Sequence, residues 1–148
     1  MNFVEHEFGT IKVKAEITCE NRDTVESLND VTARYSELGE KQKEHLYAVF
    51  LTNGNEEIGD ELLSLGTTSS ASFDLKQLVR TATLVNAGAV ILVHNHPSGQ
   101  AEPTQKDLET TRKTHDLLNE LGIQLLDHVI ITHQNHHSMR RHGDGPFK

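Results

Sequence analysis

The sequence feature that most constrains the fold is a run of residues, 89–93, that is apolar at every position. A short apolar run without alternation is typical of a β-strand that is buried on both faces. Residues 46–51 form a second run of this kind. Both runs therefore predict central strands of a sheet whose faces are covered by other elements.

The spacing of apolar residues in the rest of the sequence predicts the remaining strands and helices. Strands are predicted over residues 11–17, 46–51, 58–65, 89–93 and 123–132. Helices are predicted over residues 24–38, 74–87 and 104–121, with Asp74 as an N-cap and with Gly39, Gly88 and Gly122 as stop signals. Asn53-Gly54 marks a hairpin turn. The order predicts an α/β (α+β) fold, a mixed β-sheet flanked by helices.

Length and composition indicate one cytoplasmic domain over residues 1–148, because a chain of this size buries a sufficient core alone. The lone Cys19 cannot form an internal disulfide, and no charged-then-apolar leader opens the sequence. Both observations argue against secretion. The longest near-continuous apolar run, residues 87–93, is far shorter than the roughly 20 residues that cross a bilayer, so no membrane association is expected.

The net charge of the chain bears on the kind of molecule that it binds. Fourteen basic residues against 22 acidic ones give a net charge of -8, which disfavours a domain that holds nucleic acid through its phosphates. Residues 133–148 are locally basic, so a weak anion-binding edge stays open as an alternative. The commoner meaning of such a tail is a solvated, partly mobile terminus, and this is the expectation here.

Residues able to bind a metal follow the run 89–93 directly. His94 and His96 are separated by one residue and precede a Pro-Ser-Gly turn. Alternate side chains of an extended segment share a face, so both imidazoles can point at one ion. A bare His-x-His is more often a locally hydrogen-bonded pair than a metal site, so this spacing alone does not decide.

Asp107 adds a carboxylate in the first turn of the predicted helix that follows. Thr104 and Asp107 equally match a capping box, and the two interpretations are compatible because the cap leaves one carboxylate oxygen free for an ion. Two histidines and one carboxylate would leave the fourth zinc position open for water, as catalytic sites require. Such a water could attack a carbonyl, with a nearby carboxylate carrying the proton.

At this point the residues resemble a family. The string His94-x-His96, seven residues, Thr104, two residues, Asp107 is similar to the HxH-x7-S/T-x2-D core of JAMM (MPN-type, JAB domain) metallohydrolases. The runs HNHPSG, PTxxD and DHVIIT resemble the RadC branch. The resemblance covers roughly residues 44–143, within a domain core of about 24–143. It implies a layered sandwich similar to that of cytidine deaminases. The sequence departs from full-length RadC-like proteins in one respect, because their helix-hairpin-helix module is not expected in the residues ahead of the resemblance.

The resemblance also implies roles for individual residues. Zn²⁺ would be bound by His94, His96 and Asp107, and Thr104 stands where the family has a hydroxyl that helps hold the oxyanion or the water. The family uses a glutamate at the start of an early strand as general base. Glu44 is the best positional match, and Glu61 on the returning strand is a second candidate.

The implied function is a zinc metallohydrolase acting on a peptide or an isopeptide-linked protein. One alternative is a RadC-type DNA-repair or mobile-element accessory protein, and another is a non-catalytic MPN interaction module. The other histidines carry less information. His128 and His115 are expected as hydrogen-bonded residues of the core or behind the ligands. Adventitious metal binding is expected of the remaining tail histidines, His133, His136, His137 and His142.

Overall fold

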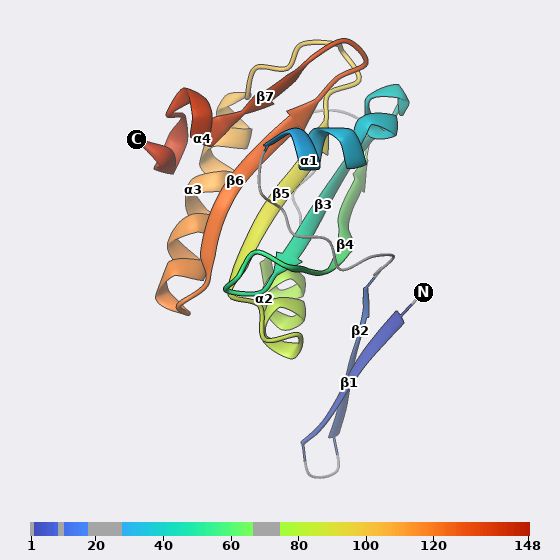
Figure 1. Cartoon of the computed structure of the whole chain (residues 1–148), viewed down its shortest axis with the longest axis vertical. Helices are drawn as coiled ribbons and strands as arrows, with labels where there is room; N and C mark the ends of the chain where they lie inside the picture. The colour runs from blue at the N-terminus through green and yellow to red at the C-terminus, as the bar shows by residue number, and fades with distance from the viewer. Residues whose placement is uncertain (1, 9–10, 18–27, 67–74) are drawn as a thin grey trace.

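A mixed five-stranded sheet with the order β4-β3-β5-β6-β7 forms the centre of the protein (Figure 1). The structure is a computed structural model that describes residues 2–8, 11–17, 28–66 and 75–148. The strands are β3 (Glu44–Leu51), β4 (Glu57–Gly66), β5 (Ala89–Asn95), β6 (Gln124–Ile131) and β7 (His136–Ser138). β5 pairs antiparallel with β3 and parallel with β6. The predicted mixed sheet is thereby confirmed.

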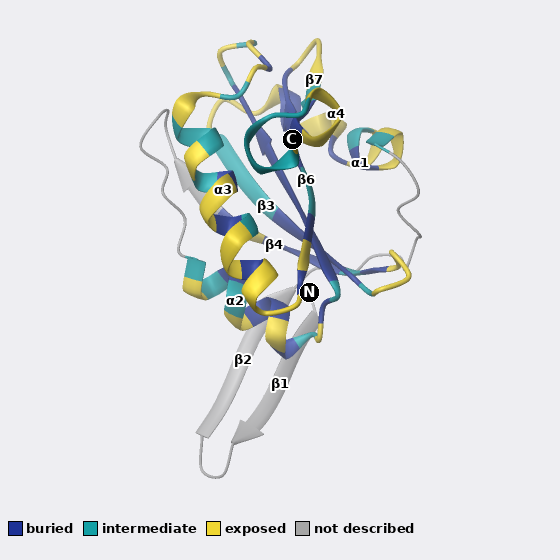
Figure 2. Ribbon diagram, turned by 90° about the vertical axis from the view of Figure 1, so that its left-hand side faces the viewer, coloured by how far each residue is buried: buried dark blue, intermediate teal, exposed yellow. Residues whose placement is uncertain are grey.

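Helices cover both faces of this sheet. α2 (Leu75–Leu84) and α3 (Gln105–Glu120) pack on one face, and α1 (Leu28–Arg34) with the 3-10 turn η1 (Ser36–Glu40) packs on the other. The outer side of α3 is exposed and its inner side is buried (Figure 2). The chain ends in α4 (Met139–His142) and η2 (Gly145–Phe147). In the described part of the chain, no helix combines the length and apolar character that crossing a lipid bilayer requires.

A separate two-stranded antiparallel sheet is formed by β1 (Asn2–Phe8) and β2 (Ile11–Ile17). The second of these strands was predicted from its alternating pattern, and the first was not. The antiparallel hairpin of β3 and β4 is also confirmed, although its left-handed residue is Asn55, with φ of 63°, rather than Gly54.

The core is organised around β5, which is buried at every position. Val90 and Leu92 pack in the cluster that includes residues of α2 and α3, such as Leu78 and Leu118. Ile91 and its odd-numbered neighbours pack in the cluster on the α1 side. Full burial of one such side chain stabilises the folded state by about 1.5–3 kcal/mol. Packing on both faces therefore stabilises the central strand.

One irregularity in β6 changes which side chains face the candidate site. Val90 pairs with Leu125 and the next residue, Ile91, pairs with Asp127, so Leu126 is an extra residue in β6. An extra residue reverses the alternation beyond it. Leu125 therefore packs on the α2 and α3 side, and Val129 packs on the α1 side. The same reversal directs His128 toward α3, where it meets Thr111.

Two predicted stop glycines have other roles. The predicted helix over residues 24–38 is α1 followed by η1 in its described part, and Gly39 lies inside η1. A Cβ on Gly39 would lie 2.7 Å from the carbonyl carbon of Thr132, so the glycine permits a close approach of two backbones. α2 ends at Leu84, and Asn86, with φ of 53°, takes the left-handed conformation predicted for Gly88. The predicted cap Asp74 lies outside the described residues.

Gly88 serves packing in the same way, because its Cβ would lie 2.9 Å from the backbone nitrogen of Asn53. Gly122 behaves as predicted, with φ of +72° after the end of α3.

The prediction of a solvated, mobile tail is wrong for residues 136–147. β7 pairs with β6, and Met139 in α4 is completely buried. Asp127 anchors the segment, because its carboxylate accepts hydrogen bonds from the Ser138 hydroxyl and from the Arg140 backbone nitrogen. The Arg140 side chain donates to the carbonyl of Leu126. These contacts use tertiary partners, which local charge and composition do not reveal.

We predict that Gly39→Ala lowers the free energy of unfolding by about 1–3 kcal/mol, because its methyl group would press on a backbone carbonyl that cannot rotate away. Urea unfolding measures the loss. Gly54→Ala is the matched control, since the nearest atom to its Cβ would be 3.8 Å away. Equal stability of the two variants would show that the contact between Gly39 and Thr132 is not tight.

Candidate metal centre

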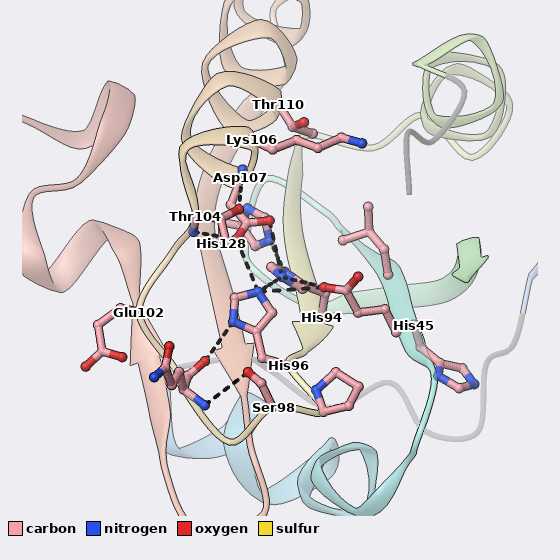
Figure 3. A pocket seen from close by; sticks show the side chains of 14 residues that line it. His45, His94, His96, Ser98, Glu102, Thr104, Lys106, Asp107, Thr110 and His128 are labelled. Carbon is pink, nitrogen blue, oxygen red and sulfur yellow. Dashed lines mark hydrogen bonds and ion pairs between the residues drawn. The ribbon is translucent and has the colours of Figure 1, made fainter. Parts of the chain in front are cut away.

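The candidate site lies where β5 ends and α3 begins (Figure 3). Thr104 is the N-cap of α3: its side chain accepts from Asp107 N at 3.2 Å, and Asp107 Oδ2 accepts from Thr104 N at 2.7 Å. The predicted capping box is confirmed. It holds the Asp107 carboxylate in one orientation at the helix N-terminus, beside the end of β5.

Four side chains converge at this point. His94 Nε2 and His96 Nε2 are 2.7 Å apart. Asp107 Oδ2 is 3.1 Å from His96 Nε2, and Asp107 Oδ1 is 3.4 Å from His94 Nε2. Glu44 Oε1 lies 3.8 Å from His96 Nε2 and 4.0 Å from His94 Nε2. Ligand atoms of Glu44, His94 and His96 all lie within 4.8 Å of one another, so this group could hold a metal ion.

The orientation of His96 is set by the loop that follows it. Its Nδ1 lies 2.8 Å from the carbonyl oxygen of Gln100, and a carbonyl only accepts hydrogen bonds. His96 therefore carries a hydrogen on Nδ1 in this contact. In its neutral form the ring then presents the lone pair of Nε2 to the convergence point, which is the geometry of a metal ligand. Sequence reasoning missed Gln100, whose contribution is a backbone atom without a residue-type signal.

The electrostatics favour a positive charge between the carboxylates. Burial raises the pKa of Asp107, but hydrogen bonding with His96 and Thr104 outweighs this and holds the pKa well below its usual range. Burial lowers the pKa of His96, and the bond to Asp107 reverses the shift to a net increase. Burial is also the main reason that the pKa of Glu44 is raised and that of His94 is lowered.

Asn95 is a site residue that sequence reasoning missed. It is completely buried between the two histidines and, by strand alternation, points to the opposite side. Its Oδ1 accepts from His45 N at 2.7 Å, and its Nδ2 donates to the carbonyl oxygens of Lys41 at 3.2 Å and Lys43 at 3.0 Å. These bonds fix the backbone on both sides of Glu44. The sequence signal that could have indicated Asn95 is its position as a polar residue just after the apolar run 89–93.

The family follows from comparison with known proteins. A family model described as the RadC-like JAB domain matches residues 25–144. The chain belongs to this family. A UPF0758 protein of Vibrio vulnificus (strain YJ016) is 43% identical over 96 residues, which are 65% of this chain and 43% of the relative. A UPF0758 protein of Vibrio campbellii (strain ATCC BAA-1116) is 45% identical over 94 residues, covering 64% of this chain and 42% of the relative.

This RadC-like JAB domain therefore spans less than half the length of the curated relatives that it matches. The resemblance inferred from HNHPSG and its neighbouring motifs is confirmed at the level of the family. The mixed sheet with helices on both faces is consistent with the JAB fold.

The JAB domain brings together the residues that the motif singled out. Glu44, His94, His96, Thr104 and Asp107 all line one cavity of about 230 Å³. Glu61, the second candidate base, is elsewhere: it pairs with Ala48 in the sheet, and its carboxylate accepts from the Thr81 hydroxyl at 2.9 and 3.0 Å.

The histidines for which the sequence predicted lesser roles have different surroundings in the JAB domain. His128 lies behind His94, with its Nε2 2.6 Å from His94 Nδ1. His115 is partly exposed on α3 beside Asp116. Among the described residues, the tail histidines His133, His136, His137 and His142 do not form a cluster of three ligand atoms comparable to the one at Glu44.

We predict that the metal-free protein loses stability in acid partly through His128. Burial lowers the pKa of this ring to about 4, whereas the unfolded chain takes up a proton near the ordinary value of 6.5. The stabilising effect is therefore complete above pH 6.5 and is lost as the pH falls toward 4, with a total of about 3 kcal/mol. Urea unfolding at pH 7, 5.5 and 4 measures it.

His128→Gln is the comparison for this titration, because glutamine keeps a polar side chain without an ionisable group. Its free energy of unfolding should decline less steeply over the same pH range. Parallel declines in the two proteins would exclude His128 as a source of the acid sensitivity.

Proposed function

We propose that this JAB domain is a zinc-dependent hydrolase that cleaves an amide bond, either in a peptide or in an isopeptide linkage. The observation that carries the proposal is the close approach of His94 Nε2 and His96 Nε2, at 2.7 Å, beside the carboxylates of Asp107 and Glu44. Two ring nitrogens this close need either a hydrogen on one of them or a metal cation between them, and the two adjacent carboxylates favour a metal cation.

The donor set favours zinc. Two imidazoles and one carboxylate are typical of three-ligand catalytic zinc sites, whereas magnesium and calcium prefer oxygen ligands. His94, His96 and Asp107 would hold the ion, since their atoms lie closest to one another. When bound, zinc supplies a Lewis acid that lowers the pKa of a coordinated water and polarises a substrate carbonyl.

Glu44 is suited to carry the proton. Its carboxylate lies 3.8 and 4.0 Å from the Nε2 atoms of His96 and His94, whereas that of Asp107 lies 3.1 and 3.4 Å from them. A carboxylate whose pKa is raised by burial accepts a proton more readily at neutral pH, and the same group can then deliver it to the leaving nitrogen. Glu44 would therefore act as the general base and then as the general acid.

Thr104 supports the reaction from the other side of the cavity. Its oxygen accepts a hydrogen bond within the capping box, which leaves its own O–H to donate. Directed at a developing oxyanion, such a donor stabilises the transition state more than the ground state. Its position in the wall of the cavity supports this role.

Charge supports a peptide chain as the substrate rather than a polyanion. The chain has a net charge of -8, and Glu44, Glu102 and Asp107 all line the cavity. Nucleic acid would bring phosphates toward these carboxylates at an electrostatic cost. Arg140, part of the locally basic tail, donates to the Leu126 carbonyl and lies over the ring of Phe147. The Arg140 guanidinium is therefore already engaged within the protein, which makes it less available to an anion.

We predict that the purified protein contains one zinc per chain and hydrolyses a peptide or isopeptide substrate, with activity lost on chelation and restored by zinc. Glu44→Gln should lower kcat by about 10²- to 10⁴-fold while zinc content is unchanged, because the proton carrier is removed and the ligands stay. Fluorogenic peptides, isopeptide-linked conjugates and labelled oligonucleotides form the substrate set, and elemental analysis measures the zinc.

Glu61→Gln separates the two candidate bases. It should keep the activity, because Glu61 bonds to α2 rather than lining the cavity. Wild-type activity in Glu44→Gln would reject Glu44 as the base. Chelator-sensitive cleavage of oligonucleotides alone would overturn the proposed substrate class, and protein without stoichiometric zinc would overturn the metal.

A further inference from the structure

A chain of hydrogen bonds runs from His94 away from the cavity and into the layer between β6 and α3. His94 Nδ1 lies 2.6 Å from His128 Nε2, and His128 Nδ1 lies 2.6 Å from Thr111 Oγ1. The Thr111 hydroxyl lies 2.6 Å from the carbonyl oxygen of Asp107. His94, His128 and Thr111 are exposed by only 5%, 1% and 0%. Each polar atom in this chain therefore has to be satisfied by its protein partner.

The far end of the chain fixes the direction of the hydrogens. The carbonyl oxygen of Asp107 can only accept, so Thr111 uses its single hydrogen there. Met139 Sδ, at 3.6 Å from the same hydroxyl, is a weak acceptor and does not compete. Thr111 Oγ1 is then an acceptor toward His128. The His128 ring must carry its hydrogen on Nδ1.

The same reasoning fixes which nitrogen of His94, a candidate metal ligand, carries the hydrogen. A neutral His128 with a hydrogen on Nδ1 presents a lone pair at Nε2, so the hydrogen in the contact with His94 belongs to His94 Nδ1. The Nε2 of His94 is left without a hydrogen and faces His96 Nε2. His96 reaches the same tautomer by a separate route, through the carbonyl of Gln100. With His96 neutral, both rings thus present lone pairs to one point.

We propose that Thr111 and His128 are positioning residues that fix the tautomer of His94, so that its Nε2 is preset as a metal ligand. The inference rests on the proposed metal site. The network closes on itself, since Asp107 receives the last hydrogen bond through its carbonyl and offers its carboxylate to His94 Nε2 at 3.4 Å. It therefore ties β5, β6 and the first turn of α3 around the ion.

Thr111→Val tests this role without touching a proposed ligand. Valine has nearly the volume of threonine but cannot accept from His128, so the His128 ring becomes free to adopt either tautomer. A hydrogen on His128 Nε2 would force the hydrogen of His94 to Nε2, where it opposes the ion. The zinc dissociation constant, measured by competition with a chromogenic chelator, should rise by about 10- to 100-fold.

Two matched variants separate this effect from general loss of packing. Thr111→Ser keeps the hydroxyl and should keep zinc affinity close to that of the wild type. Thr114→Val removes a second completely buried hydroxyl, one that donates to the Thr110 carbonyl at 2.8 Å on the same helix and lies outside the network. It should leave zinc affinity unchanged. Circular dichroism and thermal melting of each metal-free protein establish that the fold is retained.

A spectroscopic readout tests the proposal without zinc or activity. Long-range ¹⁵N–¹H correlation spectra of the metal-free protein report which ring nitrogen carries a hydrogen. We expect His94 and His128 to carry it on Nδ1 in the wild type and in Thr111→Ser, with Nε2–H forms populated in Thr111→Val.

The outcomes distinguish this inference from the proposed hydrolase. A hydrogen on Nε2 of either ring in the wild type, or wild-type zinc affinity in Thr111→Val, would overturn the positioning role. The expected tautomers and zinc affinities in a protein that hydrolyses no substrate would support the positioning role and count against the hydrolase alone. If Thr111→Val does not fold, the wild-type spectra still decide between the two tautomers.

Discussion

The complete burial of β5 between two paired strands is the constraint on which the rest of the protein depends. β3 and β6 hold it from both edges and side chains pack on both of its faces, so the strand cannot shift along its axis without breaking two ladders at once. His94 and His96 are therefore placed at the end of a strand that is held on both edges and both faces. The burial of these polar rings is tolerated because their nitrogens have partners in the protein.

The side chains at the end of β5 have different roles on its two faces. His94 and His96 face the cavity, while Asn95 between them binds the backbone that leads into β3. One buried amide therefore helps to set the distance between Glu44 and the imidazoles. Asp107 is placed by an equally local device, the capping box of α3. Three elements thus converge through short-range contacts, which is how a site is organised before its substrate arrives.

Sequence patterns predicted those parts of the protein that depend on near neighbours in the chain. The apolar runs 46–51 and 89–93 became the central strands, Gly122 ended α3, and Thr104 with Asp107 formed the cap. Other features depend on contacts between distant segments. Gly39 and Gly88 are required by Thr132 and Asn53, and the tail is held by Asp127. The partner of His128 could not be predicted either, because the extra residue Leu126 decides which face that ring takes.

That extra residue has a consequence for how related sequences should be aligned and engineered. The face that His128 takes depends on where β6 departs from regular pairing with β5. If Leu126 paired with Ile91 and the pairing continued without the irregularity, His128 would turn to the α1 side and Val129 would face α3. Deletion of Leu126 would instead make the pairing regular while leaving Asp127 opposite Ile91 and His128 opposite Leu92. Alignments and chimeras of this domain should therefore place a one-residue gap in β6 at Leu126, where the network of His94 is kept.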